Sequence, residues 1–401
     1  MVLSDKKRAD KEQIIMTDII HGRPRPIPVD NPFFRWWQSI DQWTLLATLG
    51  LIVVGLLLSM AASVPLADSN DKPMFYYVYR QVIYAVISFS LIIFLSSTNL
   101  SVIRRFGIVG FFLVVFALAF LPIFGTDFGK GAVRWYSLNW ITIQPSEYLK
   151  PFFVVFVSWV VSGNIDRNPR AAIILSFFSM CVCVFLLTLQ PDLGQTVVLV
   201  GCWVLIHFVV GVSWLFSAVF FTFISTIAFI FYQFSNHVAI RLKTFFSNVI
   251  EPTSQMGLVE QAIHLGGFLG VGAGNGNVKW SLPDAHTDFI IAVAIEEFGL
   301  IVFFLILTLF VVILLRTLSR LLIQRNPFIL LVGLGLLTII QAQALINLGV
   351  AARLLPTKGM TLPFISYGGS SMVAMGILMG LLLNVTRRRT SDNIDTFMGG
   401  T

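Results

Sequence analysis

Long apolar stretches of about 20 residues follow one another through most of this chain and limit what it can fold into. A helix that crosses the hydrocarbon core of a bilayer needs about 20 mostly apolar residues. Of the 401 residues, 56% are hydrophobic and only 12% are charged, whereas a soluble domain carries roughly 25% charged residues. The sequence therefore predicts an all-α polytopic membrane protein. Its three cysteines lie inside apolar stretches and are expected to be packing residues: Cys181, Cys183 and Cys202.

Window hydropathy predicts about ten transmembrane helices. Their expected ranges are 43–63, 76–97, 106–124, 146–162, 171–189, 194–211, 213–233, 288–315, 328–350 and 364–386. Residues 1–42 then form a cytoplasmic N-terminal segment, and residues 387–401 form a cytoplasmic tail. Residues 234–287 form a long extracytoplasmic loop between helices seven and eight, which we expect to pack over the bundle as short helices and turns. Because the first forty or so residues are charged and contain prolines, we expect no signal peptide.

The net charge of +7 is explained by membrane topology. The basic residues cluster in alternate connections between the spans, which is the positive-inside pattern and places both termini in the cytoplasm. These clusters contain Lys6, Lys7, Arg8, Arg104, Arg105, Arg167, Arg170, Arg316, Arg320, Arg325, Arg387, Arg388 and Arg389. We therefore expect no nucleic-acid partner. The polar motifs gather in the opposite connections, so we expect the chemistry at the outer face of the membrane, on a substrate carried by lipid.

Asp288 is the leading candidate for a catalytic residue. It stands at the mouth of a predicted membrane helix, where a carboxylate is expensive to keep and is a functional candidate by default. His286 and Thr287 are placed to position Asp288 or a substrate hydroxyl. The alternative is that Thr287 and Asp288 only cap the helix. Glu296 and Glu297 follow in the same helix and are expected to make buried polar contacts lower in the bundle.

A second group of polar residues spans Arg134 to Lys150. Glu147 and Lys150 are three residues apart, so they share a helix face and can pair. Such a pair inside a membrane either fixes helix packing or lines a polar cavity. Arg134, near the mouth of that cavity, suits a phosphate because its planar guanidinium donates bidentate hydrogen bonds. Trp135 is either part of the cavity or an ordinary interfacial aromatic residue.

Two further connections carry polar candidates. Asp192, within Gln-Pro-Asp-Leu-Gly, either caps the next helix or contributes to the cavity or to a cation site. Arg241 and Lys243 in the long loop are candidates for phosphate contacts, with contact to lipid headgroups as the alternative. The glycines at 266–276 permit close backbone approach to a ligand but do not match a P-loop, since no Gly-Lys-Ser/Thr follows at the required spacing.

The segment 354–371 combines prolines and glycines with Lys358, Ser366 and Tyr367. This composition predicts an irregular membrane segment. Irregular backbone at membrane depth is tolerated only beside a cavity or buried in protein. The Gly-Gly-Ser-Ser part at 368–371 alternatively allows close helix packing.

Together these motifs resemble the SEDS family, the polytopic glycosyltransferases that polymerise lipid II into peptidoglycan strands. The matching segments, in the family's order, are 131–135, 144–150, 190–194, 282–289 and 356–371. Segments 276–279 and 356–363 resemble the FtsW-type division branch, in its alphaproteobacterial form, more than the RodA-type elongation branch. The chain departs from the family's pattern at Gln261–Leu265, which contains His264, and at Arg353, where a small or uncharged residue is expected.

The resemblance implies ten helices, an external active site at the bacterial inner membrane and Asp288 as the essential carboxylate. The expected substrate-binding residues are Arg134, Trp135, Gln144, Ser146, Glu147, Lys150, Asp192, Arg241, Lys243, His286, Thr287, Lys358, Ser366 and Tyr367. A divalent cation, Mg²⁺ or Mn²⁺, is an expected cofactor to which the sequence assigns no ligands, and no organic cofactor is expected. The expected partners are lipid II, a class B penicillin-binding protein that crosslinks the strands, and other division proteins at the septum.

Two other functions fit the same composition. A transporter that flips lipid II across the membrane suits the intramembrane Glu147, Lys150 and Glu296, although the polar motifs cluster on one face and no inverted repeat is evident. A scaffold for division partners would use the N-terminal segment 1–42.

Overall fold

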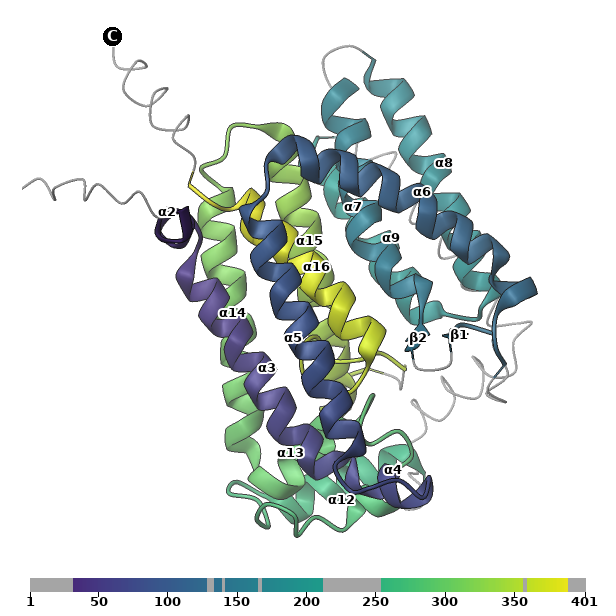
Figure 1. The fold of residues 1–401 in the computed structure, drawn as a ribbon, viewed down its shortest axis with the longest axis vertical. Coiled ribbons are helices and arrows are strands. Elements are labelled where there is room, and N and C mark those ends of the chain that lie inside the picture. Colours follow the sequence, from purple (N-terminus) through teal and green to yellow (C-terminus); the bar gives the residue numbers. More distant parts are fainter. Residues whose placement is uncertain are drawn as a thin grey trace, which may run out of the picture. The chain divides into compact units, whose positions relative to one another are not determined.

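The computed structural model describes residues 32–127, 133–138, 141–164, 168–211, 254–355 and 359–388. Nearly all regular structure in these residues is helical (Figure 1). The chain divides into two units. The first covers residues 1–39, of which α2 (Pro32–Ser39) is described, and the second covers residues 40–401 and contains all the elements discussed below.

The long helices of the second unit follow the ranges expected from hydropathy. They are α3 (Gln42–Ala62), α5 (Tyr76–Ser97), α6 (Leu100–Phe124), α7 (Pro145–Asn164), α8 (Pro169–Leu189), α9 (Leu193–Val209), α14 (Leu300–Leu321), α15 (Pro327–Ala351) and α16 (Gly369–Val385). Within the described residues, six of these have the length and apolarity of a membrane span: α3, α5, α6, α8, α14 and α15. The helix expected at 213–233 lies outside the described residues.

The single helix expected at 288–315 is wrong, because the chain breaks there into α13 (Ile290–Phe298) and α14. The break is at Gly299, whose φ of +77° is a left-handed conformation that favours glycine. A Cβ at this position would also lie 2.1 Å from the carbonyl oxygen of Phe268. The expectation that a helix begins at residue 364 is also wrong, since α16 begins at Gly369.

The helices of the second unit pack in pairs that are far apart in sequence. In Figure 1, α5 lies along α16, α3 along α14, and α6 along α7. Helix α15 packs against α7, α9, α14 and α16. Helices α15 and α16 are therefore mostly buried, whereas α5, α6 and α14 expose large apolar side chains along their length. This distribution is that of a bundle whose outer helices face lipid.

Several short elements lie in the connections where the sequence places the polar motifs. Strands β1 (Tyr136–Leu138) and β2 (Ile141–Ile143) pair antiparallel with Tyr136 opposite Ile143. Helices α4 (Val64–Ser69) and α12 (Gln255–Gly266) gather with α13 at one end of the bundle (Figure 1). A 3₁₀ turn, η1 (Val278–Trp280), follows α12. The expectation of short helices and turns is thus confirmed for residues 254–287, the described part of the long loop.

At the other end of α3 and α14, Asp41 holds helices together through two arginines. Its carboxylate accepts hydrogen bonds from Arg316 Nη2 at 3.0 Å, Arg320 Nη2 at 3.4 Å and Thr44 Oγ1 at 2.9 Å. Arg320 also donates to the carbonyl of Thr386, just after α16. Burial by itself raises the pKa of Asp41, but the hydrogen bonds and the two guanidinium charges outweigh it and lower that pKa below its ordinary value.

We expect Asp41→Asn to lower the stability of the protein by about 2 kcal/mol, the typical contribution of hydrogen bonds to a charged group. Since the folded-state pKa of Asp41 lies below its ordinary value of 3.8, this contribution is complete above that value and is lost as the pH falls through the folded-state pKa. The measurement is the thermal midpoint of both proteins in detergent between about pH 7 and pH 3. Asp68→Asn, at an exposed carboxylate, is the control. A difference in thermal midpoint between the wild type and Asp41→Asn that stays constant over this whole pH range would contradict the role of the Asp41 carboxylate.

Candidate active site

Asp288 lies in a tight turn directly before α13. The amide groups of Thr287, Asp288 and Phe289 all point to the carbonyl oxygen of Asp284, at 3.1, 3.1 and 3.4 Å. Helix α13 begins at Ile290 with Phe289 as its N-cap residue, so neither Thr287 nor Asp288 simply caps this helix. The side chain of Asp288 is half-buried. The turn therefore fixes the backbone of the carboxylate and leaves the side chain partly accessible.

The irregular segment before α16 packs along this turn. Ser366 Oγ donates to the carbonyl of Thr287 at 2.5 Å, and the amide of Tyr367 donates to the carbonyl of His286 at 3.0 Å. The rings of His286 and Tyr367 lie with their centroids 5.9 Å apart. Four residues predicted from two distant motifs are thus brought together beside Asp288.

Asn347 of α15 also fixes the backbone of Asp288. Its Nδ2 donates to the carbonyls of Asp288 at 3.0 Å and Met360 at 2.7 Å, which ties the two segments together. The carboxylate of Asp288 lies beside Gly359, where an added Cβ would be 3.0 Å from Oδ2. The absence of a side chain at Gly359 therefore gives the carboxylate its space.

The pair expected between Glu147 and Lys150 is confirmed. Lys150 Nζ lies 2.7 Å from Glu147 Oε2, and both side chains are almost fully buried. Gln195 Nε2 of α9 donates to the second carboxylate oxygen, Glu147 Oε1, at 2.6 Å. Breaking a buried ion pair by removing one partner typically costs about 3–5 kcal/mol. The hydrogen bond from Gln195 ties this pair on α7 to α9, which supports the packing alternative.

Arg134 and Asp192 organise the turn between α8 and α9. The guanidinium of Arg134 donates to the carbonyls of Gln190 and Pro191, both at 2.8 Å. Asp192 accepts the amide of Gln195 at 3.4 Å as the N-cap of α9, which confirms the capping alternative. Burial raises the pKa of Asp192, an effect that the charge of Arg134 opposes. The phosphate contact expected of Arg134 stays a prediction.

Ser370, at the start of α16, joins these two groups of residues. Its hydroxyl donates to the carbonyl of Thr142 at 2.8 Å and accepts the amide of Gln144 at 3.0 Å. Gln144 in turn donates from Nε2 to Ser146 Oγ at 3.1 Å, and Ser146 lies 3.5 Å from Asp192 Oδ2. These bonds form a network that ties the start of α16, which follows the segment packed beside Asp288, to the polar residues around Asp192.

Some of the predicted residues are not placed in this network. Trp135 forms a backbone bridge with Thr126 at the end of α6. Arg241, Lys243 and Lys358 lie outside the described residues. Across the described ranges, no group of three or more His, Cys, Asp or Glu side chains is placed to hold a metal ion. The divalent cation expected from the sequence stays a prediction, since Mg²⁺ is usually held by only one or two carboxylates together with substrate phosphates, and we derive no step through a metal.

Glu296 and Glu297 hold the glycine-rich loop onto α13. Their buried polar contacts are confirmed, but these contacts are with this loop and not lower in the bundle, as the sequence analysis expected. Glu296 Oε1 accepts the amides of Asn277 at 2.7 Å and Val278 at 2.9 Å. Glu297 pairs with Lys279 at 2.5 Å and accepts the amide of Gly274 at 2.9 Å. Both glutamates are 1% exposed.

The backbone of α13 adds two more bonds to the same loop. The amides of Val271 and Gly272 donate to the carbonyls of Glu296 at 2.9 Å and Glu297 at 3.0 Å. Residues 271–279 are therefore attached to the last turn of α13, while Asp288 stands directly before its first turn. We call the contacts of Glu296 and Glu297 with residues 271–279 the loop clamp. The clamp and the turn at Asp288 together hold both ends of the segment 271–288.

Several residues of this arrangement were missed by the sequence analysis. Gln195, Asn347 and Ser370 each connect two predicted motifs, and Lys279 completes the loop clamp. The signal that could have found Gln195 and Asn347 is a polar side chain within an apolar membrane helix, which usually faces protein. Their partners are distant in sequence, so that signal names the residue but not its role.

We expect Glu297→Gln to loosen the loop, because it leaves Lys279 buried without a countercharge, a change that costs about 3–5 kcal/mol. The measurement is hydrogen–deuterium exchange of the amides at 271–281. Exchange should rise by at least ~10-fold in Glu297→Gln. In Glu297→Gln/Lys279→Met it should return toward the wild-type rate, because no unpaired charge remains. Equal exchange in the single variant and the wild type would show that the clamp does not hold the loop.

Comparison with known proteins agrees with the geometry. A family model described as "Cell cycle protein", that of FtsW, RodA and SpoVE, matches residues 42–391. A probable peptidoglycan glycosyltransferase FtsW of Caulobacter vibrioides is 37% identical over 362 residues, which cover 88% of this chain and 91% of the relative. Stage V sporulation protein E of Bacillus subtilis is 32% identical over 372 residues, covering 87% and 97%.

Solved structures share the fold. A chain from a peptidoglycan synthase complex, described as coordinating polymerization and crosslinking, aligns with a TM-score of 0.71 at 24% identity. The alignment covers 87% of this chain and 98% of that one. The rod shape determining protein RodA of Thermus thermophilus aligns with a TM-score of 0.65 at 23% identity, covering 87% and 97%.

Proposed function

Since this chain belongs to the FtsW/RodA/SpoVE family of cell cycle proteins, the SEDS family, we propose that it is a peptidoglycan glycosyltransferase of the division type. Its substrate is lipid II, the lipid-linked disaccharide pentapeptide. The reaction lengthens a glycan strand at the membrane surface. The division type rather than the elongation type is supported by the relatives named FtsW and by segments 276–279 and 356–363.

Asp288 acts as the general base. It accepts the proton of the acceptor sugar's 4-hydroxyl while that oxygen attacks the anomeric carbon of the donor. The bond from this carbon to the phosphate oxygen breaks, and undecaprenyl pyrophosphate leaves with the bonding electrons. Attack from the opposite face inverts the anomeric centre and gives a β-1,4 linkage. Because pyrophosphate is a good leaving group, the reaction needs no second carboxylate as general acid, unlike a typical glycosidase.

The observation that carries this proposal is the placement of Asp288. A catalytic side chain must be held by a rigid shell, and a general base must reach the proton that it removes. The turn on Asp284 and the hydrogen bond from Asn347 fix the backbone of Asp288. Gly359 leaves space beside the carboxylate, and the side chain is half-buried and partly accessible. His286, Thr287, Ser366 and Tyr367 lie on the two segments that meet beside Asp288.

The charge that develops on the pyrophosphate requires cationic groups. The candidates from the sequence are Arg134, Arg241, Lys243 and Lys358. Arg134 retains donors on its guanidinium beyond the two that bind the Gln190 and Pro191 carbonyls. Lys150 donates from Nζ to Glu147 Oε2 at 2.7 Å and is almost fully buried, and the substrate contact expected of it stays a prediction.

The protein is a multi-pass membrane protein, and the finer topology belongs to this proposal. We place the active site at the outer face, both termini in the cytoplasm and the protein at the division septum. The basic residues Arg316, Arg320 and Arg387 meet at the end of the bundle opposite Asp288, which supports this orientation by the positive-inside rule. A class B penicillin-binding protein is the proposed partner, since the chain that shares this fold with a TM-score of 0.71 comes from a peptidoglycan synthase complex described as coordinating polymerization and crosslinking.

We expect Asp288→Asn to lower lipid II polymerisation by about 10²–10⁴-fold, the usual contribution of general acid–base catalysis. The measurement is the formation of glycan strands from purified lipid II by the full-length protein with its cognate transpeptidase. Asp71→Asn, at an exposed position between α4 and α5, is the matched control and should keep wild-type activity. An Asp288→Asn protein that is folded and fully active would refute the role of this carboxylate.

Gly359→Ala gives a graded second test of the same placement. Its Cβ would lie 3.0 Å from Asp288 Oδ2, which forces the carboxylate to shift. We expect about a tenfold loss of polymerisation with unchanged thermal stability, because small displacements of a catalytic group are costly. Wild-type activity in this variant would mean that the reacting carboxylate does not occupy the position described here.

A further inference from the structure

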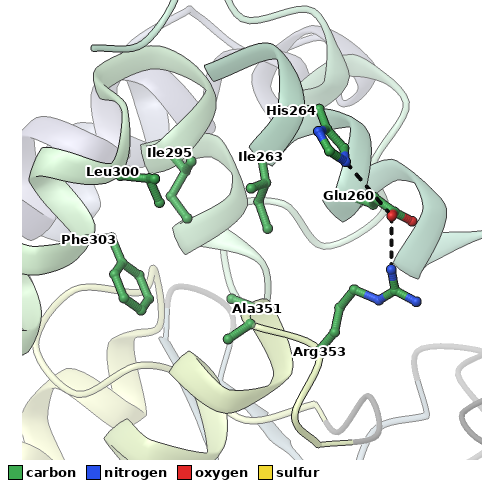
Figure 2. A pocket seen from close by; sticks show the side chains of 9 residues that line it. Glu260, Ile263, His264, Ile295, Leu300, Phe303, Ala351 and Arg353 are labelled. Carbon is green, nitrogen blue, oxygen red and sulfur yellow. Dashed lines mark ion pairs between the residues drawn. The ribbon is translucent and has the colours of Figure 1, made fainter. Parts of the chain in front are cut away.

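A cavity of about 320 Å³ lies between α12, the junction of α13 with α14, and the end of α15 (Figure 2). Its walls are mostly apolar, formed by Ile263, Ile295, Leu300, Phe303 and Ala351. No residue assigned above to the candidate active site lines it. Its volume is at the lower end of the range of about 300–1,000 Å³ for small-molecule sites. The cavity therefore has room for part of an elongated apolar molecule.

Backbone contacts fix the elements that form one wall of this cavity. The amide of Leu300 donates to the carbonyl of Gly267 at 3.1 Å, which ties α14 to the end of α12. A Cβ at Gly266 would lie 2.0 Å from the carbonyl oxygen of Ile295, so α12 lies directly on the backbone of α13. One wall is thus a rigid assembly of three helices. The facing wall is the end of α15.

Three charged or polar side chains form the rim of the cavity. Arg353 Nη1 lies 2.9 Å from Glu260 Oε1, and His264 Nε2 lies 3.9 Å from the same oxygen, as Figure 2 shows. Arg353 and Glu260 are 41% and 36% exposed, so both remain accessible. Arg353 follows α15 with a φ of +59°, a left-handed conformation in which glycine is usual. The chain keeps an arginine there despite the strain, and its guanidinium reaches across the mouth of the cavity.

The surroundings of the cavity are those of a lipid-facing surface. On α14, Ile301 and Phe304 are 47% and 53% exposed, and they alternate with the lining residues Leu300 and Phe303. Beyond α12, Phe268 and Leu269 are exposed as well. Exposed apolar side chains therefore border the cavity on α14 and beyond α12.

We propose that this cavity binds one acyl chain of a zwitterionic phospholipid that carries a primary ammonium group, with its headgroup on the Glu260–Arg353 rim. The phosphate binds the guanidinium of Arg353, whose planar donors suit phosphate oxygens. The ammonium binds the carboxylate of Glu260, so each member of the ion pair exchanges its partner for a headgroup charge. A lipid with only a negative headgroup meets the repulsion of Glu260, and a quaternary ammonium has no N–H to donate to it.

The experiment uses the full-length protein in nanodiscs that contain a phospholipid with a photoactivatable diazirine at the end of one acyl chain. Three probes carry the same chain and differ only in the headgroup: phosphatidylethanolamine, phosphatidylcholine and phosphatidylglycerol. Labelled peptides are quantified by mass spectrometry. We expect the ethanolamine probe to label the peptides of Phe303 and Ala351 about tenfold more than the other two probes, the effect of one charged hydrogen bond. Phe116, exposed on α6, should be labelled equally by all three.

Two variants test the interior of the cavity and its rim separately. Ile263→Trp fills the cavity and should reduce labelling at Phe303 and Ala351 by about tenfold for every probe. Ile174→Trp, on the exposed face of α8, is its matched control and should change nothing. Glu260→Gln should keep the labelling of the peptides of Phe303 and Ala351 but abolish the preference for the ethanolamine headgroup.

Two results would overturn the proposal. If the pocket peptides are labelled no more than Phe116, the cavity does not hold an acyl chain, and an apolar side chain of another protein becomes the better occupant. If labelling is strong but independent of the headgroup in the wild type, the rim does not select a zwitterionic lipid. Both readouts are independent of glycosyl transfer, so they stand whether or not the proposed activity is confirmed.

Discussion

Irregular backbone at the edge of a membrane must find its hydrogen-bond partners within the protein, and here two buried glutamates supply them. Glu296 and Glu297 accept amides from the loop at 274–278, and their own carbonyls accept two more. An unsatisfied peptide group in hydrocarbon costs several kcal/mol. A glycine-rich loop that has no regular structure of its own is therefore stable only on this last turn of α13. The position of Asp288, at the other end of the same helix, depends on that attachment.

The same end of the bundle shows how this protein distributes its buried charges. Glu147 and Lys150 are paired with each other, and Glu297 is paired with Lys279, and all four side chains are almost fully buried. Asp288 instead is half-buried and partly accessible, and its backbone is fixed by hydrogen bonds with Asp284 and Asn347. Rigidity of the main chain combined with access to the side chain is what a general base needs. This contrast separates the proposed catalytic carboxylate from the structural ones.

The membrane helices were predictable because hydrophobicity and length alone determine them. The range expected for α5 is identical to the observed one, and those of α3, α7 and α15 differ by no more than about two residues at each end. The break at Gly299 was not predictable in this way, since the close approach of Phe268 that leaves no room for a side chain there is a tertiary contact. The same distinction between local sequence signals and tertiary contacts applies to the candidate site. The sequence placed Asp288, Ser366 and Tyr367 in polar motifs, whereas the contact between their segments depends on Asn347 of a third helix, which hydropathy treats as a minor interruption.

The central claim is that the acceptor sugar binds where the turn at Asp288 meets the segment 359–367. The most direct measurement is a structure of the Asp288→Asn protein, in which turnover is blocked, with the lipid-linked disaccharide bound. The account predicts a sugar hydroxyl within hydrogen-bond reach, about 3 Å, of the side chain at position 288, with His286 and Tyr367 beside the ring. A disaccharide bound at the opposite end of the bundle, near Asp41 and Arg316, would contradict it.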